Sequence, residues 1–412
     1  MTSRPDPSAA PTPFRAGSAD DASSPAAAGA GRRAVLLSGH YYASHRKANF
    51  HFLADALAAD GWDVTFVTTQ ISPVSRLRGD PRFEYPVEAE AGRPVAKPGG
   101  VTSFVWMTPF HVFHLRSDLM DRLSAPLFGL YPRLPLGALE PIVRAADLIM
   151  VESTGALLLV ERLRRLNPRA RLVYRVSDDT RNLGQHRIVV EAEERVLPLF
   201  DLVSAPSRYT VRRFGHLPNI RFQPHGVDVS VFDRPTPRPY PPGGVHLVSV
   251  GHSFFDYDFA DAASALFPDW TFHLVGKLER RFERPNVRWY GEIPFAETVP
   301  FVQHADAGLA PYVYREGAET LADSSLKLTQ YTWCRLPSVA PDFATRADRP
   351  HVLGYNPGDR DSIYAALQAA RNFDRQSVSR AGIRSWAELA RLIAGDAAEA
   401  PAPQLLAAGG RA

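Results

Sequence analysis

The sequence predicts an α/β protein with two successive, doubly wound parallel sheets. The length of 412 residues exceeds the usual size of one domain and favours two domains of about 150–200 residues each. Short apolar runs alternate with stretches of helical periodicity along most of the chain, as strands and crossover helices do in a parallel sheet. A segment rich in proline and glycine, residues 229–244, interrupts this alternation and separates two halves.

The first half opens with residues 1–32, which are mostly Ala, Pro, Ser and Gly. This composition offers little apolar surface to offset the entropy of ordering, so we expect a disordered tail. From residue 33 an apolar run, a turn at residues 38–40 and a helical stretch follow one another. The strands expected in this half are 34–37, 63–68, 148–151, 171–176 and 202–204, and the helices include 48–58 and 155–166.

The second half repeats the alternation from residue 245 onward. The strands expected there are 245–250, 270–276, 287–291, 307–312 and 337–340, and the helices are 259–266, 294–304 and 324–334.

These patterns predict the domain organisation. We expect an N-terminal domain at 33–232, a proline-rich linker at 233–244, a C-terminal domain at 245–399 and a second disordered tail at 400–412. Whether the last helix crosses back to the first domain is left open. Ligands of such sheets bind at the carboxyl ends of the strands, which predicts a site in a cleft between two facing domains.

The residue counts exclude or disfavour several function classes. Lys and Arg number 47 against 44 Asp and Glu, and no basic stripe with interleaved aromatics occurs, which disfavours nucleic-acid binding. Cys334 is the single cysteine, which excludes an intramolecular disulfide and a zinc site of several thiolates. No Gly-x-Gly-x-x-Gly follows the first strand, which disfavours a dehydrogenase.

No apolar run reaches about 18 residues and no secretory pattern opens the sequence. We therefore expect the protein in the cytoplasm, including the membrane face of that compartment.

The segment 321–331 (LADSSLKLTQY) is the most informative part of the second half. Asp323 or Ser324 could cap a helix whose free N–H groups and positive dipole end face the cleft, where an anion would bind. Lys327 and Gln330 stand three residues apart and share a face, so they could contact a diphosphate or a ribose together. The alternative is a capped surface helix with a solvated Lys327.

Seven blocks of the sequence carry a resemblance through both expected domains: SGHYYASHRKANFHFLADAL (38–57), RLRGDPR (76–82), LVYRVSDD (172–179), HGVD (225–228), VGHSFFD (250–256), APY (310–312) and LADSSLKLTQY (321–331). Together they resemble the GumK family of glucuronosyltransferases of xanthan assembly. The resemblance implies a GT-B fold and an inverting, metal-independent enzyme. Such an enzyme moves glucuronic acid from UDP-glucuronic acid to the mannose of a polyprenyl-diphosphate-linked oligosaccharide at the inner membrane. The partners implied are a UDP-sugar, a lipid-linked acceptor and a membrane surface, with no metal and no other cofactor.

Inverting sugar transfer needs a base for the acceptor hydroxyl and a positive group for the departing diphosphate. The resemblance implies that Asp178, directly after the apolar run 171–176 and Ser177, is the base. It also implies that Lys327 and the dipole of its helix stabilise the leaving group. Whether Asp178 or Asp179 points into the cleft stays open, and either could instead cap the next helix.

The resemblance also implies a set of donor-site residues. Ser253 and Leu326 stand where the family has methionine, so another UDP-hexose is an alternative donor. A catalytically silent scaffold that binds nucleotide sugars is the remaining interpretation. Asp228 and Asp256 match acidic positions of the family, and both could simply bond loop backbone. The donor-binding residues expected are Ser253, Asp256, Tyr312, Ser324, Ser325, Leu326, Lys327 and Gln330, with Asp228 and Asp179 elsewhere in the cleft.

Other patterns indicate rival sites more weakly. Asp-x-Asp, the metal-binding pattern of GT-A glycosyltransferases, occurs at 256–258 and at 359–361, and this repetition shows how little the pattern specifies. Residues 111–114 (HVFH) could ligate a metal, yet a partly buried histidine pair is the expectation. Glu316 and Glu319 lack a second glutamate eight residues onward, so the paired-glutamate pattern of retaining GT-B enzymes is missing. We expect inversion and no metal.

Residues 106–133 mix aromatic residues, leucines and arginines, as an interfacial surface does. Basic residues at 45–47 and at Arg76, Arg78 and Arg82 lie in the same half. We therefore expect this half to contact anionic lipid and the acceptor diphosphate. The alternative is an ordinary amphipathic helix packed on the sheet.

Overall fold

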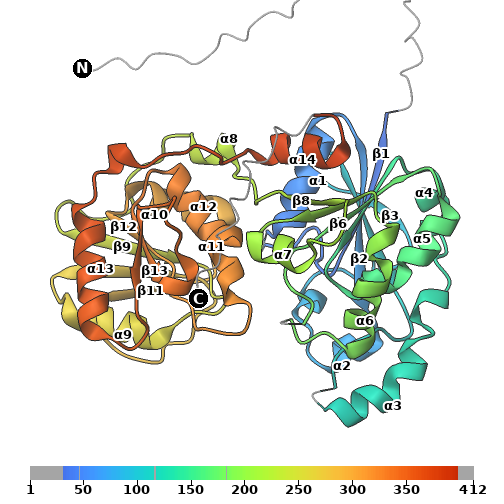
Figure 1. Cartoon of the computed structure of the whole chain (residues 1–412), viewed down its shortest axis with the longest axis horizontal. Helices are drawn as coiled ribbons and strands as arrows, with labels where there is room; N and C mark the ends of the chain where they lie inside the picture. Colours follow the sequence, from blue (N-terminus) through green and yellow to red (C-terminus); the bar gives the residue numbers. More distant parts are fainter. Residues whose placement is uncertain (1–30, 46, 116, 182, 398–412) are drawn as a thin grey trace, which may run out of the picture. The chain divides into compact units, whose positions relative to one another are not determined.

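The computed structural model describes residues 31–45, 47–115, 117–181 and 183–397 and contains two sheets, each flanked by helices (Figure 1). The tails expected at 1–32 and 400–412 lie outside the described residues, apart from Gly31 and Arg32. Two successive parallel sheets confirm the predicted fold class.

The first sheet has eight strands in the order β3-β4-β2-β1-β5-β6-β7-β8. Its central strands are buried on both faces, which explains why they occur in the sequence as continuous apolar runs. In this sheet, as far as the described residues show, the edge pair β3 and β4 is antiparallel and the other pairs are parallel. The strands are β1 (Arg33–Ser38), β2 (Asp63–Ile71), β3 (Pro94–Ala96), β4 (Val101–Met107), β5 (Leu148–Glu152), β6 (Arg171–Arg175), β7 (Leu202–Ala205) and β8 (Ile220–Phe222).

Helices connect these strands. The single helix expected at 155–166 is a 3-10 turn at Gly155–Leu159 followed by α5, because Thr154 caps the turn through the Ala156 N–H. The helices of this half are α1 (Asn49–Ala59), α2 (Pro73–Leu77), α3 (Asp118–Phe128), α4 (Leu139–Arg144), α5 (Val160–Leu166), α6 (Arg187–Val196), α7 (Arg208–Arg213) and α8 (Val229–Phe232).

The second sheet has six parallel strands in the order β11-β10-β9-β12-β13-β14. Residues 233–244, which precede β9, contain neither helix nor strand. The strands are β9 (Val245–Val250), β10 (Trp270–Val275), β11 (Val287–Gly291), β12 (Ala307–Leu309), β13 (Ser338–Pro341) and β14 (Val352–Tyr355), and the helices are α9 (Tyr257–Leu266), α10 (Phe295–His304), α11 (Leu321–Ser324), α12 (Leu326–Trp333) and α13 (Arg360–Asn372).

The last helix, α14 (Trp386–Ala394), packs against α1 beside the first sheet. Its buried residues recur at helical spacing: Trp386, Leu389, Ala390 and Ile393. The Trp386 ring stacks on Phe52 of α1 with ring centroids 5.1 Å apart. The end of the described chain therefore completes the core of its first half.

Residues 106–133, expected to form an interfacial surface, are only partly at the surface. Trp106 belongs to β4, where its indole N–H donates to the carbonyl of Pro135 at 3.0 Å, and Tyr131 is fully buried. The exposed apolar side chains of this region gather on α3 and just after it: Leu119, Met120, Leu123, Leu127 and Leu130.

Candidate active site

A cavity of about 840 Å³ is lined by loops that follow strands of both sheets. From the first sheet come Gln70 near the end of β2 and segments after β1, β5, β6 and β8, and from the second sheet come segments after β9, β10, β11 and β12. This is the position at which open parallel sheets bind ligands. Of the expected site residues, those lining the cavity are Asp178, Ser253, Tyr312, Ser324, Ser325, Leu326, Lys327 and Gln330.

The helix expected at 324–334 is broken into two pieces. Helix α11 ends at Ser324, and α12 begins at Leu326. The cap is Ser325, whose Oγ accepts from the Leu328 N–H at 3.2 Å and shares a 2.6 Å hydrogen bond with the Tyr312 hydroxyl. Capping by Asp323 or Ser324 was the wrong expectation, because Asp323 lies inside α11 and its carboxylate is bound by Arg208 and Arg346.

Lys327 projects from the first turn of α12 into the cavity wall. Its ammonium nitrogen is buried and has no hydrogen-bond partner among the described residues, and it lies 5.1 Å from the centre of the Tyr312 ring. Burial lowers the pKa of Lys327 from 10.5 to about 7. A buried cation without a counterion, next to a helix N-terminus, is a ready site for an anionic ligand.

More positive groups line the same wall. Lys277 follows β10 and Arg315 follows β12, and both are exposed side chains on the cavity lining. Glu292, after β11, is the one carboxylate that this wall contributes to the lining among the described residues. The wall formed by the second sheet is thus suited to a ligand with several negative charges.

Asp178 lies on the opposite wall, directly after β6 and Ser177. Ser177 is held from three sides: its N–H donates to Ser153 Oγ, its hydroxyl donates to Glu152 Oε1, and the Asn49 amide donates to its hydroxyl, each at 2.9 Å. These bonds hold the backbone that leads into Asp178, whose exposed side chain lines the cavity.

Asp179 does not line the cavity. Its buried carboxylate is ion-paired with Arg181 at 2.9 Å and with Arg213 at 3.0 Å. Burial alone would raise the pKa of Asp179, but these two arginines hold it below the ordinary value. The carboxylate is therefore charged and engaged in the fold, and of the two adjacent aspartates it is Asp178 that lines the cavity.

Asp228 and Asp256 also lie outside the lining. Each caps a helix: Asp228 accepts from the Val231 N–H at the start of α8, and Asp256 accepts from the Phe259 N–H at the start of α9. These are the backbone-bonding roles that the sequence left open for both.

Sequence reasoning missed Glu152 and His225, which also line the cavity. Glu152 ends β5, and a carboxylate at the end of an apolar run was the available signal. The fully buried guanidinium of Arg175 donates to His225 Nδ1 at 2.9 Å, so the hydrogen of the imidazole resides on Nε2. Burial, and to a lesser extent the positive charge of Arg175, keep the pKa of His225 well below its ordinary value.

Within the described residues, no group of three or more His, Cys, Asp or Glu side chains could hold a metal ion.

Comparisons with known proteins identify relatives of this chain. Residues 36–206 match the family model described as the N-terminal domain of glucuronosyltransferase GumK. Over 352 residues the chain is 34% identical to a UDP-glucuronate:glycolipid 2-beta-glucuronosyltransferase of Xanthomonas campestris pv. campestris, covering 84% of this chain and 86% of that protein.

Solved structures share the arrangement of the two sheets. A sucrose-phosphate synthase from Thermosynechococcus elongatus matches with a TM-score of 0.58 at 16% identity, covering 88% of this chain and 94% of that one. An alpha,alpha-trehalose-phosphate synthase (UDP-forming) from Burkholderia xenovorans matches with a TM-score of 0.54 at 13% identity, covering 89% and 100%. At these identities the likeness shows the fold alone, which is GT-B as predicted.

Proposed function

Because this chain belongs to the GumK family of glucuronosyltransferases, we propose that it transfers glucuronic acid from UDP-glucuronic acid to a mannosyl residue of a polyprenyl-diphosphate-linked oligosaccharide. One observation carries the proposal: a single cavity has the buried, unpartnered ammonium of Lys327 on one wall and the carboxylate of Asp178 on the other. These are the two groups that metal-independent sugar transfer needs.

The donor binds with its diphosphate on Lys327 and on the free N–H groups of α12. Tyr312, Ser325 and Gln330 surround that position and contact the rest of the nucleotide sugar. Glucuronic acid adds a carboxylate to the two diphosphate charges, and the cations of Lys277 and Arg315 on the same wall favour such a donor.

The reaction is a direct displacement. Asp178 takes the proton of the acceptor hydroxyl, and the resulting oxygen attacks the anomeric carbon from the face opposite the diphosphate. The bond from that carbon to the diphosphate oxygen breaks, and Lys327 stabilises the charge that develops on the departing UDP. One displacement turns the α-linked donor sugar into a β-linked product, so the enzyme inverts configuration.

We assign the two halves of the chain different tasks. Residues 33–232 carry Asp178 and bind the acceptor, residues 245–399 carry Lys327 and bind the donor, apart from α14, which packs on the first half, and residues 233–244 link them. Ser253 and Leu326 line the donor wall where the family has methionine, and this difference favours another UDP-hexose as the second candidate donor.

A lipid-linked acceptor requires contact with a membrane surface, which we assign to α3 at the cytoplasmic face of the inner membrane. Within the described residues, no helix combines the length and the apolar character needed to cross a bilayer. On α3, however, Leu119 is 64% exposed and Leu123 is 67% exposed, as suits a helix lying in the interface.

The basic residues expected to face lipid divide into two groups. His45 and Lys47 line the cavity, where they suit the acceptor diphosphate, and Arg46 lies outside the described residues. Arg76 is paired with Glu88, the guanidinium of Arg78 lies 4.3 Å from the centre of the Phe113 ring, and the guanidinium of Arg82 is bonded within the fold.

The test is transfer by purified protein from radiolabelled UDP-glucuronic acid to a mannose-terminated, polyprenyl-diphosphate-linked oligosaccharide in detergent. We expect a product that β-glucuronidase cleaves. Asp178→Asn should lose turnover and keep donor binding by calorimetry, whereas Asp179→Asn should keep turnover below its unfolding temperature. Transfer from UDP-glucose alone would identify the alternative donor. Donor binding without any transfer would identify a silent scaffold.

A further inference from the structure

Backbone strain gathers at the cavity. In the described part of the chain, the non-glycine residues with positive φ are Gln70 (φ 54°), Phe254 (φ 55°) and Arg335 (φ 53°). Gln70 and Phe254 both line the cavity, Gln70 on the wall of Asp178. Left-handed backbone at a residue with a full side chain persists only where the surroundings hold it, and such residues concentrate at functional sites.

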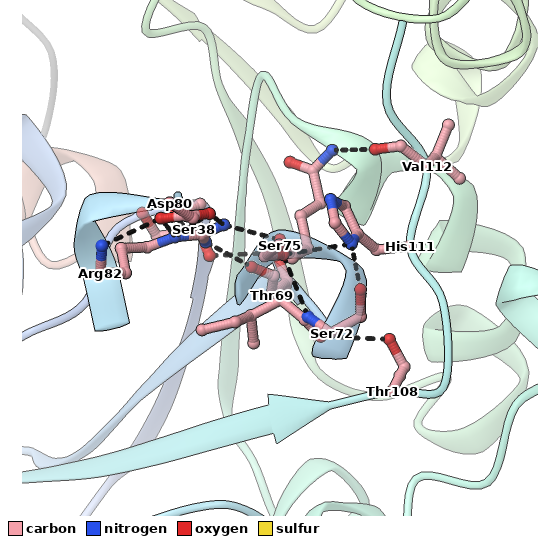
Figure 2. A network of polar contacts seen from close by, with 12 residues as sticks. Ser38, Thr69, Ser72, Ser75, Asp80, Arg82, Thr108, His111 and Val112 are labelled. Atoms are coloured by element: carbon pink, nitrogen blue, oxygen red, sulfur yellow. Dashed lines mark hydrogen bonds and ion pairs between the residues drawn. The ribbon is translucent and has the colours of Figure 1, made fainter. Parts of the chain in front are cut away.

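Arg82 holds the backbone around Gln70. One guanidinium nitrogen donates to the carbonyls of Gly39 at 2.7 Å and Thr69 at 3.1 Å, and the other donates to the carbonyl of Gln70 at 2.7 Å. Figure 2 shows Arg82 facing Asp80, whose carboxylate accepts from it at 2.6 Å. Burial alone would raise the pKa of Asp80, but Arg82 holds it below its ordinary value, so the pair stays ionised. The planar guanidinium of Arg82 thereby holds three carbonyl groups next to the cavity in place.

The side chain of Gln70 is also oriented. Its amide nitrogen donates to the carbonyl of Val112 at 3.2 Å, and its backbone N–H donates to the hydroxyl of the fully buried Tyr131 at 3.3 Å. Gly155 leaves room for it: a Cβ at Gly155 would lie 2.7 Å from the amide nitrogen of Gln70. With the nitrogen engaged, the amide oxygen of Gln70 accepts no hydrogen bond from the described residues.

Part of this wall has a matching chemistry, alongside the charged side chains of Lys47, Glu152 and Asp178. Neutral hydrogen-bonding groups, from Asn49, Ser153, Thr154 and Gln185, line it beside Gln70. Neutral amides and hydroxyls pair with the hydroxyls of an uncharged sugar, whereas the cations on the opposite wall pair with the donor.

From this geometry we propose that Gln70 recognises the acceptor sugar, its amide oxygen accepting a hydrogen bond from one hydroxyl of that sugar. Arg82 acts as a positioning residue that holds Gln70 in its left-handed conformation. The inference rests on the proposed function and deepens it, because it assigns a specificity-determining residue to the acceptor. A site built to bond one hydroxyl discriminates strongly against a substrate that lacks it.

The test uses Gln70→Gly, since glycine adopts positive φ without strain and removes only the amide side chain. We expect the KM for the acceptor to rise about tenfold, the Kd for the donor to stay unchanged and the unfolding temperature not to fall. Gly155→Ala, which displaces the amide, should raise the same KM. Arg82→Lys should raise it too, because an ammonium cannot reach all three carbonyls. Arg335→Gly, at the left-handed position outside the cavity, is the matched control and should leave both constants unchanged.

A series of acceptors, each lacking one hydroxyl of the terminal mannose, separates recognition from a structural role. The wild-type protein should discriminate against one member of the series, and Gln70→Gly should treat that member like the intact acceptor. An acceptor KM within twofold of wild type in Gln70→Gly would overturn the inference. So would an equal loss across the whole series. Absence of any transfer by the wild-type protein would overturn the proposed function and this inference with it.

Discussion

Lys327 on the cavity wall allows a quantitative prediction about pH. The pKa of Lys327 falls from 10.5 to about 7 because its ammonium is buried without a partner, a difference of about 5 kcal/mol in the preference for the charged form. A diphosphate bound to the Lys327 ammonium replaces the water that burial removed, and so restores the preference of the amine for its charged form. Binding of UDP-glucuronic acid should therefore draw a proton onto Lys327 wherever the free protein lacks one.

The expected magnitude follows from the protonated fraction of Lys327. At pH 8 about one protein molecule in ten carries the charged lysine, against about nine in ten at pH 6, so the Kd for UDP-glucuronic acid should be about tenfold weaker at pH 8. The diphosphate diester and the carboxylate of this ligand stay ionised between pH 6 and pH 8, so they add no pH dependence of their own to the Kd. The sign for stability is the opposite: the free protein gains stability from about pH 7 upward to about 10.5, because the unfolded chain still holds the proton there.

Calorimetry measures both effects. Titrations in two buffers of different ionisation enthalpy should report uptake of about 0.9 proton per ligand at pH 8 and about 0.1 at pH 6. Histidines such as His225 and His252 also line the cavity, so Lys327→Met, a neutral side chain of similar length, is the control. An affinity independent of pH in the wild type, or an equal proton uptake in Lys327→Met, would refute the reasoning.

Three further predictions concern other parts of the fold. Asp179→Asn breaks the buried pairs with Arg181 and Arg213 and should lower the free energy of unfolding, measured by urea denaturation, by about 3 kcal/mol. A free energy of unfolding close to that of the wild type would show that these pairs contribute nothing to stability. Trp386→Ala removes the ring that stacks on Phe52 and should cost about 3–5 kcal/mol in the same assay, whereas a loss below about 1 kcal/mol would contradict the packing described. Leu123→Asp, on the exposed face of α3, should abolish sedimentation with anionic vesicles while turnover on a detergent-solubilised acceptor stays the same; unchanged sedimentation would remove α3 from the membrane surface.

The sequence predicted the two sheets because their central strands are buried on both faces and therefore stand out as apolar runs, as in residues 34–37 and 148–151. It did not reveal the edge strand β3, whose three residues are too few to show a strand pattern, or the 3-10 turn before α5, whose residues continue the helical spacing of α5. The break at Ser325 was missed for a different reason, because the contacts of the neighbouring Asp323 come from far away in the sequence. Asp323, the expected cap, is instead bound by Arg208, more than 100 residues earlier.

Local sequence predicted which residues line the cavity better than it predicted their contacts. Lys327 was evident from its segment, but its burial depends on packing against Tyr312 from another loop. The choice between Asp178 and Asp179 could not be made from adjacent residues, because Arg213, from α7, engages Asp179. Gln70 carried no signal at all: its left-handed backbone follows from Arg82, and a motif alone does not show what its arginine contacts.

The return of α14 to α1 has a consequence for biosynthesis. The apolar surface around Phe52 is made early on the ribosome, but the Trp386 ring that covers it is added more than 300 residues later. At translation rates of about 5–20 residues per second, the surface around Phe52 stays uncovered for roughly 20–70 s after its synthesis. A fragment ending after α8 would keep the surface uncovered permanently and should self-associate. Chaperone protection during synthesis is therefore expected to matter more for the first half of this chain than for the second.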